Sequence, residues 1–420
     1  MAKSIPQSTL SYRLLTWGLF PTALIYTGIT AFKYRNCHYL TERLGLYQNP
    51  KNKNQVIWCH CASVGEINTA LPLLSKLIEN GEHLLVTTNT VTGKQALNKA
   101  QLKNTQHAFL PLDYHSLTRR LIRNFSPKFL LIFETELWPN ILTTVKRHNI
   151  PSAIINGRIS NKTLHAPSLV LKNYKKVLQN ISKIIASSEE SASRFIALGA
   201  EPNKIITLDN LKFANINSSS NVASHCPINY PFLLCASTHE NEEQFIIDQW
   251  KTFDSKNLGL VIAVRHPHRS KNVCQLLDEN KLSYCLHSKN SANISKDRIY
   301  IIDTLGQLMP FMSKAEFVFM GGSLVPVGGH NIIEPALFGR CILIGPYHEA
   351  FKDIVNDLIT HDGILIIDDA EQLFNTIEML VNNPIQKKQI GLNAKNYLDN
   401  KKNVLKTYQD EILKLFKDQV

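Results

Sequence analysis

The chain has 420 residues, of which 44% are hydrophobic and 19% are charged, a composition that excludes a disordered protein and suits two domains with sizeable cores. A net charge of +12 favours an anionic partner, such as a nucleic acid, an anionic membrane surface or a phosphorylated substrate. Because the basic residues are spread out and form no zinc finger, RRM signature or basic arm, we do not expect nucleic-acid binding.

Residues 14–32 carry no charge and are flanked by basic residues on both sides. Their length is close to the roughly 20 residues that a membrane-spanning helix needs. A signal anchor, a helix in the membrane interface and a cleaved signal peptide are the three interpretations. No small-residue cleavage site follows, which disfavours cleavage, and the flanking charges leave spanning and interfacial docking open. We expect residues 1–36 to anchor a cytosol-facing protein at a membrane.

The eight cysteines form no CxxC pair, and three of them, Cys59, Cys235 and Cys341, lie within apolar strands. This pattern predicts buried thiols in a reducing compartment, not a disulfide framework, and it argues against export.

A first α/β domain is expected over residues 37–214. Apolar runs alternate with helical spacing, which is typical of a doubly wound parallel sheet. The predicted strands cover 55–62, 83–87, 108–110, 129–133, 152–155 and 183–186, and the clearest predicted helices cover 67–77, 91–100 and 117–125.

A polar, breaker-rich linker is expected over residues 215–231, followed by a second domain over 232–395 and a C-terminal helix over 396–420. The second domain repeats the α/β pattern, with predicted strands over 232–236, 259–264, 283–286, 298–302, 317–320 and 341–344 and predicted helices over 240–252 and 271–280. Two Rossmann-like halves facing each other across a cleft would bind ligands at the carboxyl ends of their strands.

The segment over 317–346 predicts a strand, a glycine-rich loop, a helix and a second strand. Its four loop glycines would let the backbone approach a ligand closely. Asn331 is expected to cap the helix, whose free N–H groups would favour an anion, and Glu334 is placed to accept hydrogen bonds from a ribose. The alternative is a tight loop in which Glu334 only complements the helix dipole, since no GxGxxG motif is present.

Ser63 and Glu66 have the S-x-x-E spacing of a capping box and open a predicted helix after a strand. A carboxylate at that point can also act as a general base that takes a proton from an acceptor hydroxyl. The spacing alone leaves both roles open.

Three further groups of polar residues follow predicted strands or precede the linker. Glu134 and Glu136 end a wholly apolar strand, where parallel sheets bind ligands, although solvated strand ends are common. Lys212 lies just before the linker, where it would face the cleft; the alternative is an ordinary solvent-exposed lysine. The cations from Arg265 to Arg269 end another strand and suit a phosphate, whereas the histidines lack the spacing of zinc ligands.

Together these segments resemble the family of 3-deoxy-D-manno-octulosonic acid (Kdo) transferases of lipopolysaccharide biosynthesis. The resemblance extends from about residue 40 to residue 370. The matching segments are HCASVGE (60–66), FETELWPN (133–140), NGRIS (156–160), SEESASRFIALGA (188–200), NLKF (210–213), ASTHENEE (236–243), RHPHR (265–269), DTLGQL (303–308) and MGGSLVPVGGHNIIEPALFG (320–339).

This resemblance implies a GT-B-type glycosyltransferase at the cytoplasmic side of the cell inner membrane. It would move Kdo from CMP-Kdo to the anionic, tetraacylated lipid A precursor, with inversion and without a metal or another cofactor. The resemblance implies that Glu66 is the proton acceptor and that Glu134 and Lys212 stabilise the transition state. The implied CMP contacts are Val264, Arg265, Leu305, Gly306, Gln307, Asn331, Ile332, Ile333 and Glu334.

The sequence departs from the family pattern at three places, where it has DNLKFA, THENEE and Gln307 instead of GNLKFD, THEGEE and Glu. These changes affect details of the donor pocket and remove no charged catalytic position. The alternatives are a related transferase that uses a UDP-sugar and a lipid-linked acceptor, or a non-catalytic membrane scaffold. The sequence does not give the number of Kdo units transferred.

Overall fold

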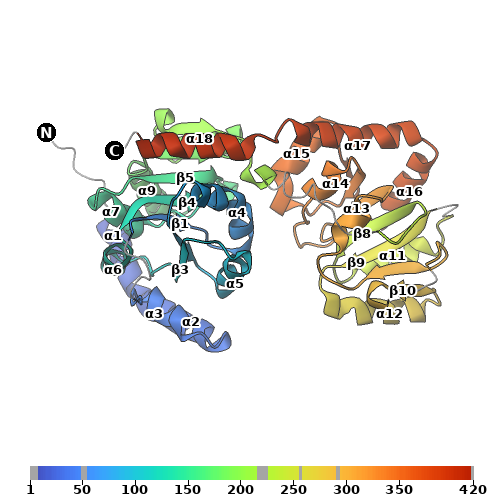
Figure 1. Ribbon diagram of the computed structural model, residues 1–420, viewed down its shortest axis with the longest axis horizontal. Coiled ribbons are helices and arrows are strands. Elements are labelled where there is room, and N and C mark those ends of the chain that lie inside the picture. Colours follow the sequence, from blue (N-terminus) through green and yellow to red (C-terminus); the bar gives the residue numbers. More distant parts are fainter. Residues whose placement is uncertain (1–7, 49–53, 215–225, 255–257, 290–293, 418–420) are drawn as a thin grey trace. The chain divides into compact units, whose positions relative to one another are not determined.

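The computed structural model describes residues 8–48, 54–214, 226–254, 258–289 and 294–417. They form two compact α/β units, one of residues 1–215 and 403–420 and the other of residues 216–402 (Figure 1). Residues 215–225 of the expected linker lie outside the described residues. The prediction of two α/β halves with parallel sheets is confirmed.

The first unit is built on a seven-stranded parallel sheet with the strand order β3-β2-β1-β4-β5-β6-β7. Strands β1, β2 and β5 are buried along their whole length, as expected for a parallel sheet that is covered on both faces. The strands are β1 (Val56–His60), β2 (Leu84–Thr88), β3 (Thr105–Phe109), β4 (Pro127–Phe133), β5 (Ser152–Gly157), β6 (Lys183–Ala186) and β7 (Ile205–Thr207).

Helices cover this sheet and pack their apolar sides against it. Trp58 and Phe195 belong to one core cluster and have no exposed surface, and Tyr39 and Phe109 belong to a second, separate cluster. The helices are α1 (Leu10–Gly18), α2 (Phe20–Lys33), α3 (Cys37–Arg43), α4 (Val64–Glu79), α5 (Val91–Ala100), α6 (His115–Phe125), α7 (Pro139–Arg147), α8 (Asn161–Leu164), α9 (Ser168–Leu178), α10 (Glu189–Ala197) and α18 (Val404–Lys417).

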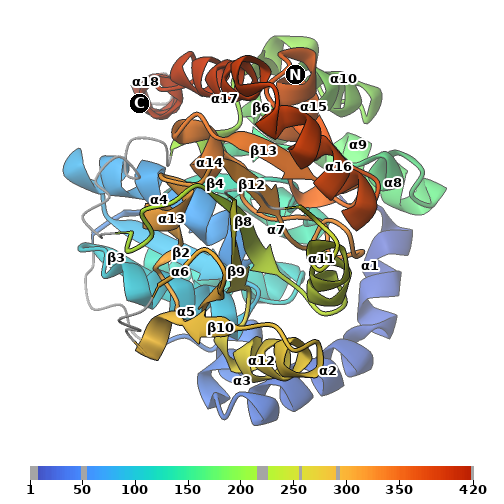
Figure 2. The same cartoon turned by 90° about the vertical axis from the view of Figure 1, so that its right-hand side faces the viewer.

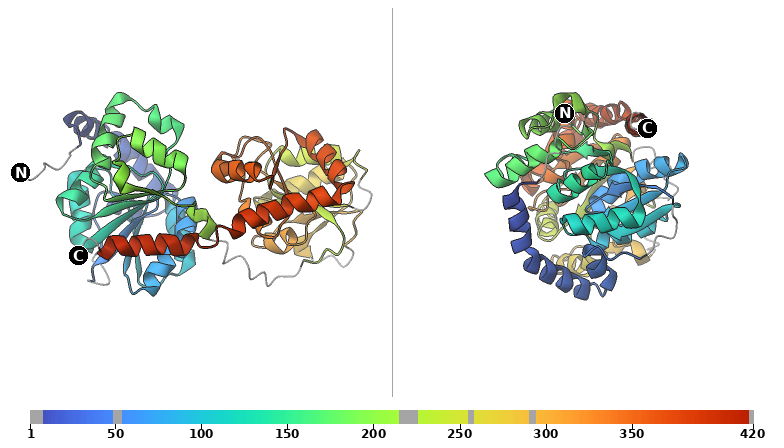
Figure 3. Two further views of the ribbon diagram at one scale, coloured as in Figure 1. Left: turned by 90° about the horizontal axis from the view of Figure 1, so that it is seen from above. Right: turned by 90° about the vertical axis from the view of Figure 1, so that its left-hand side faces the viewer.

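The C-terminal stretch, in which a helix was expected over 396–420, contains two helices, α17 and α18. Helix α17 continues past the expected boundary at residue 395 to Asp399, and the chain then turns before α18 begins at Val404. Helix α18 packs against α4 of the first unit (Figure 3, left). Its Tyr408 is fully buried there, and Phe416 contacts Phe129 edge-on at 4.9 Å.

The N-terminal segment forms two helices with a 48° bend between them, so a single anchoring helix is not confirmed. Within the described part of the chain, no single helix is long and apolar enough to cross a membrane, but α1 and α2 together have a suitable length and composition. Tyr12 of α1 donates to Asp113 at 2.9 Å, and the Tyr114 ring packs edge-on against Trp17 and Phe20. These contacts hold the helices along the outside of the first unit (Figure 3, right).

The second unit has another seven-stranded parallel sheet, in the order β10-β11-β9-β8-β12-β13-β14 (Figure 2). Its strands are β8 (Phe232–Thr238), β9 (Gly259–Val264), β10 (Tyr284–Leu286), β11 (Ile299–Ile302), β12 (Phe317–Met320), β13 (Cys341–Ile344) and β14 (Leu365–Ile366). Its helices are α11 (Glu242–Trp250), α12 (Ser270–Glu279), α13 (Leu308–Met312), α14 (Ile333–Leu337), α15 (Lys352–Thr360), α16 (Ala370–Val381) and α17 (Pro384–Asp399).

All eight cysteines are free thiols, which confirms the expectation that they form no disulfide framework. The three that were placed in apolar strands, Cys59, Cys235 and Cys341, are buried.

Candidate active site

Glu66 lies at the N-terminus of α4, just beyond the carboxyl end of β1. Ser63 is the N-cap, and its hydroxyl accepts the main-chain N–H of Glu66 at 3.4 Å. In return, one carboxylate oxygen of Glu66 accepts the N–H of Ala62 at 2.8 Å, and the other lies 3.3 Å from the Ser63 hydroxyl. The predicted capping box is therefore present, with its return bond one residue earlier than usual, and it holds the carboxylate in one orientation.

Glu66 is 8% exposed, and this burial is the main cause that raises the pKa of its carboxyl group to about 8. The hydrogen bond from Ala62 acts against this rise, whereas the charges of Glu134 and Glu136 add to it. A carboxyl group whose pKa is close to neutral pH is a much stronger base than an exposed glutamate, so the geometry that caps α4 also suits general-base catalysis.

Glu134 follows β4 directly and adopts a left-handed backbone conformation, with φ at +58°. Its main-chain N–H still donates to the carbonyl oxygen of Ile155 in the neighbouring strand β5 at 2.9 Å. A non-glycine residue in this conformation is uncommon and strained, and such residues concentrate at functional sites. The turn places Glu134 close enough to Glu66 for its charge to contribute to the raised pKa of Glu66.

Lys212 lies in the loop that follows edge strand β7, and this loop is tied back to strand β5. The main-chain N–H of Leu211 donates to the side-chain oxygen of Asn156 at 2.9 Å, and Lys212 N–H donates to Asn210 at 3.0 Å. Asn156 is fully buried, near the end of β5, with φ at +55°. This buried asparagine therefore fixes the backbone that carries Lys212 at the carboxyl edge of the sheet.

His60 and Glu136 also lie at this edge, and no catalytic role was predicted for either. The histidine Nε2 is 3.6 Å from one Glu136 oxygen, which also accepts from Asn89 at 3.1 Å and from the indole of Trp138 at 2.8 Å. The nearness of these residues depends on contacts between different strands, which no local motif reveals.

In the second unit, the glycine-rich loop is organised by Glu242 at the start of α11, a residue without a predicted role. Its carboxylate has no exposed surface and accepts four main-chain N–H groups at 2.7–3.0 Å, from His239, Gly322, Ser323 and Leu324. The loop passes so close to β8 that a Cβ on Gly321 would lie 2.6 Å from the carbonyl oxygen of Ser237. Glycine is thus required there for close backbone packing.

Asn331 is not the N-cap of its helix, contrary to the prediction. Helix α14 has only five residues, and Ile332 occupies the cap position without a side-chain bond. The Asn331 side-chain oxygen still accepts the N–H of Ile333 at 3.2 Å, while its amide donates to Glu334 at 2.9 Å. Burial raises the pKa of Glu334, and the bond from Asn331 opposes this shift. Asn331 and Glu334 are therefore hydrogen-bonded to each other, but the helix that they were expected to open is only five residues long.

The remaining predicted CMP contacts occupy three loops at the same edge of the second sheet. Val264 ends β9 and, like Ile332 and Ile333, has a buried side chain, which leaves its main chain to meet a ligand. Arg265 is exposed. Leu305, Gly306 and Gln307 precede α13, and the Leu305 side chain is 72% exposed.

A cluster of histidines lies beside Arg265. The rings of His239 and His330 are stacked, with their Nε2 atoms 2.8 Å apart, and His266 packs edge-on against His239. Burial and the nearby Arg265 lower the pKa of His330 to about 4, so the pair avoids carrying two charges. Among the described residues, no group of three or more His, Cys, Asp or Glu side chains is arranged to hold a metal ion.

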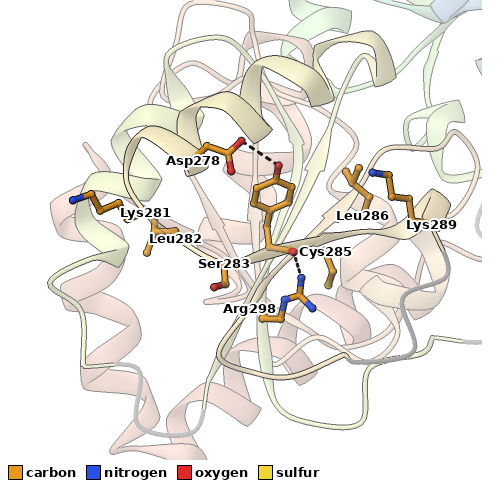
Figure 4. Close-up of a pocket in the computed structure, with 9 residues that line it drawn as sticks. Asp278, Lys281, Leu282, Ser283, Cys285, Leu286, Lys289 and Arg298 are labelled. Carbon is orange, nitrogen blue, oxygen red and sulfur yellow. Dashed lines mark hydrogen bonds between the residues drawn. The ribbon is translucent and has the colours of Figure 1, made fainter.

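A hollow of about 520 Å³ lies along edge strand β10, and no predicted site residue lines it (Figure 4). Two of its polar side chains already form hydrogen bonds within the unit. Asp278 accepts from the Tyr284 hydroxyl at 3.3 Å, and Arg298 donates to the Tyr284 carbonyl at 2.6 Å. We assign no function to this hollow.

Two α/β units, each with a parallel sheet, are typical of the GT-B architecture, and solved structures share this architecture. A glycosyltransferase from Rickettsia africae aligns with a TM-score of 0.59 at 14% identity, over 88% of this chain and 99% of its own. UDP-GlcNAc 2-epimerase from Neisseria meningitidis aligns with a TM-score of 0.60 at 14% identity, over 86% of this chain and all of its own. At these identities the likeness shows the fold alone.

Sequence comparison defines the family. Residues 38–215 match the family model described as 3-deoxy-D-manno-octulosonic-acid transferase (kdotransferase). Proteins named 3-deoxy-D-manno-octulosonic acid transferase are similar along most of the chain. The one from Rickettsia felis is 33% identical over 371 residues, or 86% of this chain and 79% of the relative. The one from Haemophilus influenzae is 30% identical over 385 residues, or 88% and 90%. The chain therefore belongs to the Kdo transferase family.

Proposed function

We propose that this protein transfers Kdo from CMP-Kdo to the tetraacylated lipid A precursor, adding one or more Kdo units. The substrates are those implied by the family to which the chain belongs. The observation that carries the chemistry is the buried, doubly hydrogen-bonded carboxylate of Glu66, whose pKa is raised to about 8 beside Glu134.

In this proposal Glu66 takes the proton from a glucosamine hydroxyl of the acceptor. The hydroxyl oxygen then forms a bond with the anomeric carbon of Kdo, while the bond from that carbon to the phosphate oxygen breaks and CMP leaves with the electron pair. Attack opposite the leaving group inverts the anomeric configuration, through a transition state with oxocarbenium character. The proton ends on Glu66 and returns to solvent before the next turnover.

Glu134 and Lys212 are the proposed stabilisers of this transition state. A carboxylate at Glu134 opposes the positive charge that develops on the sugar, and the ammonium of Lys212 opposes negative charge on the departing phosphate. The left-handed turn at Glu134 and the Asn156 bond to Leu211 hold the two backbones in place, so little reorganisation is needed during reaction.

Arg265 and the segment from Asn331 to Glu334 are proposed to bind the nucleotide. The guanidinium of Arg265 is exposed and can bind one phosphate through two parallel hydrogen bonds. Glu334 is held by Asn331 and can accept hydrogen bonds from ribose hydroxyls. The leaving group carries a single phosphate, and the guanidinium of Arg265 supplies a positive charge that opposes it.

We further propose that α1 and α2 bind the cytoplasmic face of the inner membrane. Large apolar side chains project from them into solvent, and the exposed fractions are 65% for Trp17, 67% for Tyr26, 63% for Ile29 and 87% for Phe32. Such a surface suits the interface of a bilayer, and the positive net charge favours an anionic leaflet and an anionic glycolipid.

Donor competition tests this function against the related UDP-sugar chemistry. The full-length protein in anionic vesicles is given lipid A precursor and CMP-Kdo, with CMP or UDP as competitor, and the products are read by mass. The proposal predicts products heavier by one or more Kdo units and inhibition by CMP but not by UDP. Transfer only from a UDP-sugar, with inhibition by UDP, would overturn it.

A further inference from the structure

His239 and His330 lie where the second sheet changes its winding direction. Strands β8 and β12 are neighbours at the centre of that sheet, but the chain leaves β8 toward β9 on one side and leaves β12 toward β13 on the other. Sheets of this kind bind ligands outside the carboxyl ends of two such strands. His239 directly follows β8, and His330 lies in the glycine-rich loop after β12. The proposed nucleotide contacts include neither ring.

The backbone brings the two rings together. The main-chain N–H of Gly329 donates to the Gly322 carbonyl at 2.8 Å, which closes the loop and returns His330 to the region just after β12. The main-chain N–H of His239 donates to the buried carboxylate of Glu242 at 2.9 Å. Gly322 has φ at +68°, and a Cβ there would lie only 3.1 Å from the Nε2 atom of His330. The glycine therefore leaves this ring its space beside His239.

The hydrogen bond between the rings determines where their protons lie. The two Nε2 atoms are 2.8 Å apart, so one of them carries a proton and the other accepts it. The accepting ring has no proton on Nε2, and because a neutral imidazole keeps one N–H, this ring carries its proton on Nδ1. The pair therefore presents an Nδ1–H donor whichever ring donates the shared proton. In the described part of the chain, the Nδ1 atom of neither His239 nor His330 has a hydrogen-bond partner.

Arg265 supplies a positive charge beside this pair. Burial is the main cause that lowers the pKa of both rings, to about 4 for His330, and the charge of Arg265 adds to the shift, so its guanidinium lies near them. The pair is thus uncharged near neutral pH and binds through its N–H group. Arg269, in contrast, already donates to the Glu243 carboxylate at 3.0 and 3.2 Å. Arg265 forms no ion pair with any described residue, which leaves its guanidinium open to an anion.

We infer that His330 binds the phosphate of the nucleotide sugar through its Nδ1–H, beside Arg265, and that His239 is a positioning residue that fixes this tautomer. When the Nε2–H of His239 donates to Nε2 of His330, the proton of His330 must lie on Nδ1. His330 directly precedes the segment from Asn331 to Glu334, so one nucleotide can contact both. This inference rests on the proposed function, in which CMP-Kdo is the donor.

A neutral N–H donor at this point favours the departing group over the bound substrate. The phosphate of a nucleotide sugar is a diester with a single negative charge, and it gains a second charge when its bond to the anomeric carbon breaks. The hydrogen bond from His330 therefore strengthens as CMP leaves, which stabilises the transition state. No proton has to be transferred for this effect.

The test uses substitutions that keep or remove one donor nitrogen. The amide nitrogen of asparagine is as many bonds from Cβ as Nδ1 of histidine, and that of glutamine is as many as Nε2. His330→Asn should therefore bind CMP about as tightly as the wild type, whereas His330→Gln should lower the affinity by roughly 10- to 100-fold, the effect of losing a hydrogen bond to a charged group. At His239 the order is reversed, because His239→Gln keeps the donor to His330 and His239→Asn removes it.

Titration calorimetry with CMP measures these affinities on the full-length protein. The same titration in the presence of cytidine gives the affinity for the nucleoside, which lacks the phosphate. His330→Gln should weaken the binding of CMP and leave that of cytidine unchanged, whereas a purely structural role of the ring pair would weaken both alike. His287→Gln is the matched control, at a half-buried histidine of the same unit whose Nδ1 lies 2.9 Å from the Tyr300 hydroxyl, and it should change neither affinity.

The outcomes separate this inference from the proposed function. A folded wild type that does not bind CMP contradicts the proposed function. If the wild type binds CMP, an unchanged CMP affinity of His330→Gln overturns the inference, and so does a parallel loss of CMP and cytidine binding. As a readout that needs no ligand, the ¹⁵N shifts of the His330 ring, assigned by their loss in His330→Gln, should show the proton on Nδ1 and none on Nε2. The opposite tautomer would also overturn the inference.

Discussion

The carboxylate of Glu242 accepts the main-chain N–H of Gly322 at 2.7 Å, and three further N–H groups complete its environment. One side chain at the start of α11 thereby shapes the glycine-rich loop after β12. If this carboxylate were lost, the buried N–H groups that it accepts would have no acceptor. Each unpaired buried N–H lowers the stability of the fold. The loop and the helix are thus coupled through Glu242.

Substitution of Glu242 by glutamine should destabilise the second unit and weaken CMP binding. The new amide group would point N–H donors at main-chain N–H donors, so at least one oxygen acceptor is lost. We expect a loss of roughly 2–4 kcal/mol in the free energy of unfolding. Thermal unfolding and calorimetric titration with CMP measure the two effects. Glu240→Gln, at an exposed glutamate two residues earlier, is the matched control and should change neither; equal unfolding temperatures for both variants would contradict the account.

The stability of the protein should depend on the pH through Glu66. Burial raises the pKa of this carboxyl group from 4.5 to about 8 in the folded state. Between these values the folded chain binds a proton that the unfolded chain has lost, so stability falls as the pH rises through this window. Unfolding in urea at several pH values measures the effect. Glu66→Gln cannot titrate, and its stability should fall less steeply over the same range; an identical slope in both proteins would disprove the raised pKa.

Replacement of Asn156 by alanine should lower both stability and kcat. The change leaves the buried N–H of Leu211 without its acceptor at 2.9 Å and keeps a side chain at a positive φ. We expect a cost of about 1–3 kcal/mol in unfolding free energy and a fall in kcat as the backbone of Lys212 shifts. Tyr408→Phe is the control, because the Tyr408 hydroxyl meets the same oxygen at 3.5 Å, which is a weak bond at best. A kcat lowered equally by both changes would argue against a specific role of the Leu211 bond.

Phe32→Glu should weaken binding to anionic vesicles by about tenfold or more. A phenylalanine side chain that moves from water into the bilayer contributes roughly 1.5–3 kcal/mol to the free energy of binding. Phe32 is 87% exposed on α2, so the change should leave the unfolding temperature as it is. Co-sedimentation with vesicles measures the affinity. Phe245→Glu places the same substitution at a half-exposed phenylalanine of α11 and should not alter binding. Equal binding by both variants and the wild type would refute the proposed membrane surface.

Much of the secondary structure follows from local sequence. Strands β9, β12 and β13 and helix α5 have the predicted bounds, because each is a clear periodic or apolar run that ends at a glycine, a proline or a polar residue. Strands β7 and β14 were missed. They are two or three residues long, lie at sheet edges and are only half-buried, so they lack the continuous apolar run of a central strand.

The site was predictable only in part, for a related reason. Glu66 and Glu134 stand next to strand ends and within recognisable motifs, and the structure brings them close enough to interact. The pairing of His60 with Glu136 and the loop held by Glu242 depend on partners far away in the chain, and no local spacing records them. The packing of α18 against the first unit, where Tyr408 is buried, could not be predicted for the same reason. An amphipathic pattern shows that a helix packs against something, but it does not identify the partner.

Kdo transfer with Glu66 as the base is the function proposed for this protein. The most direct measurement gives CMP-Kdo and the lipid A precursor to vesicle-bound wild type and Glu66→Gln, side by side, and reads the products by mass. We expect one or more added Kdo masses with the wild type and a loss of at least about 100-fold in kcat with the variant, while the unfolding curve of the variant stays cooperative. Undiminished transfer by Glu66→Gln, or no transfer by a folded wild type, would contradict it.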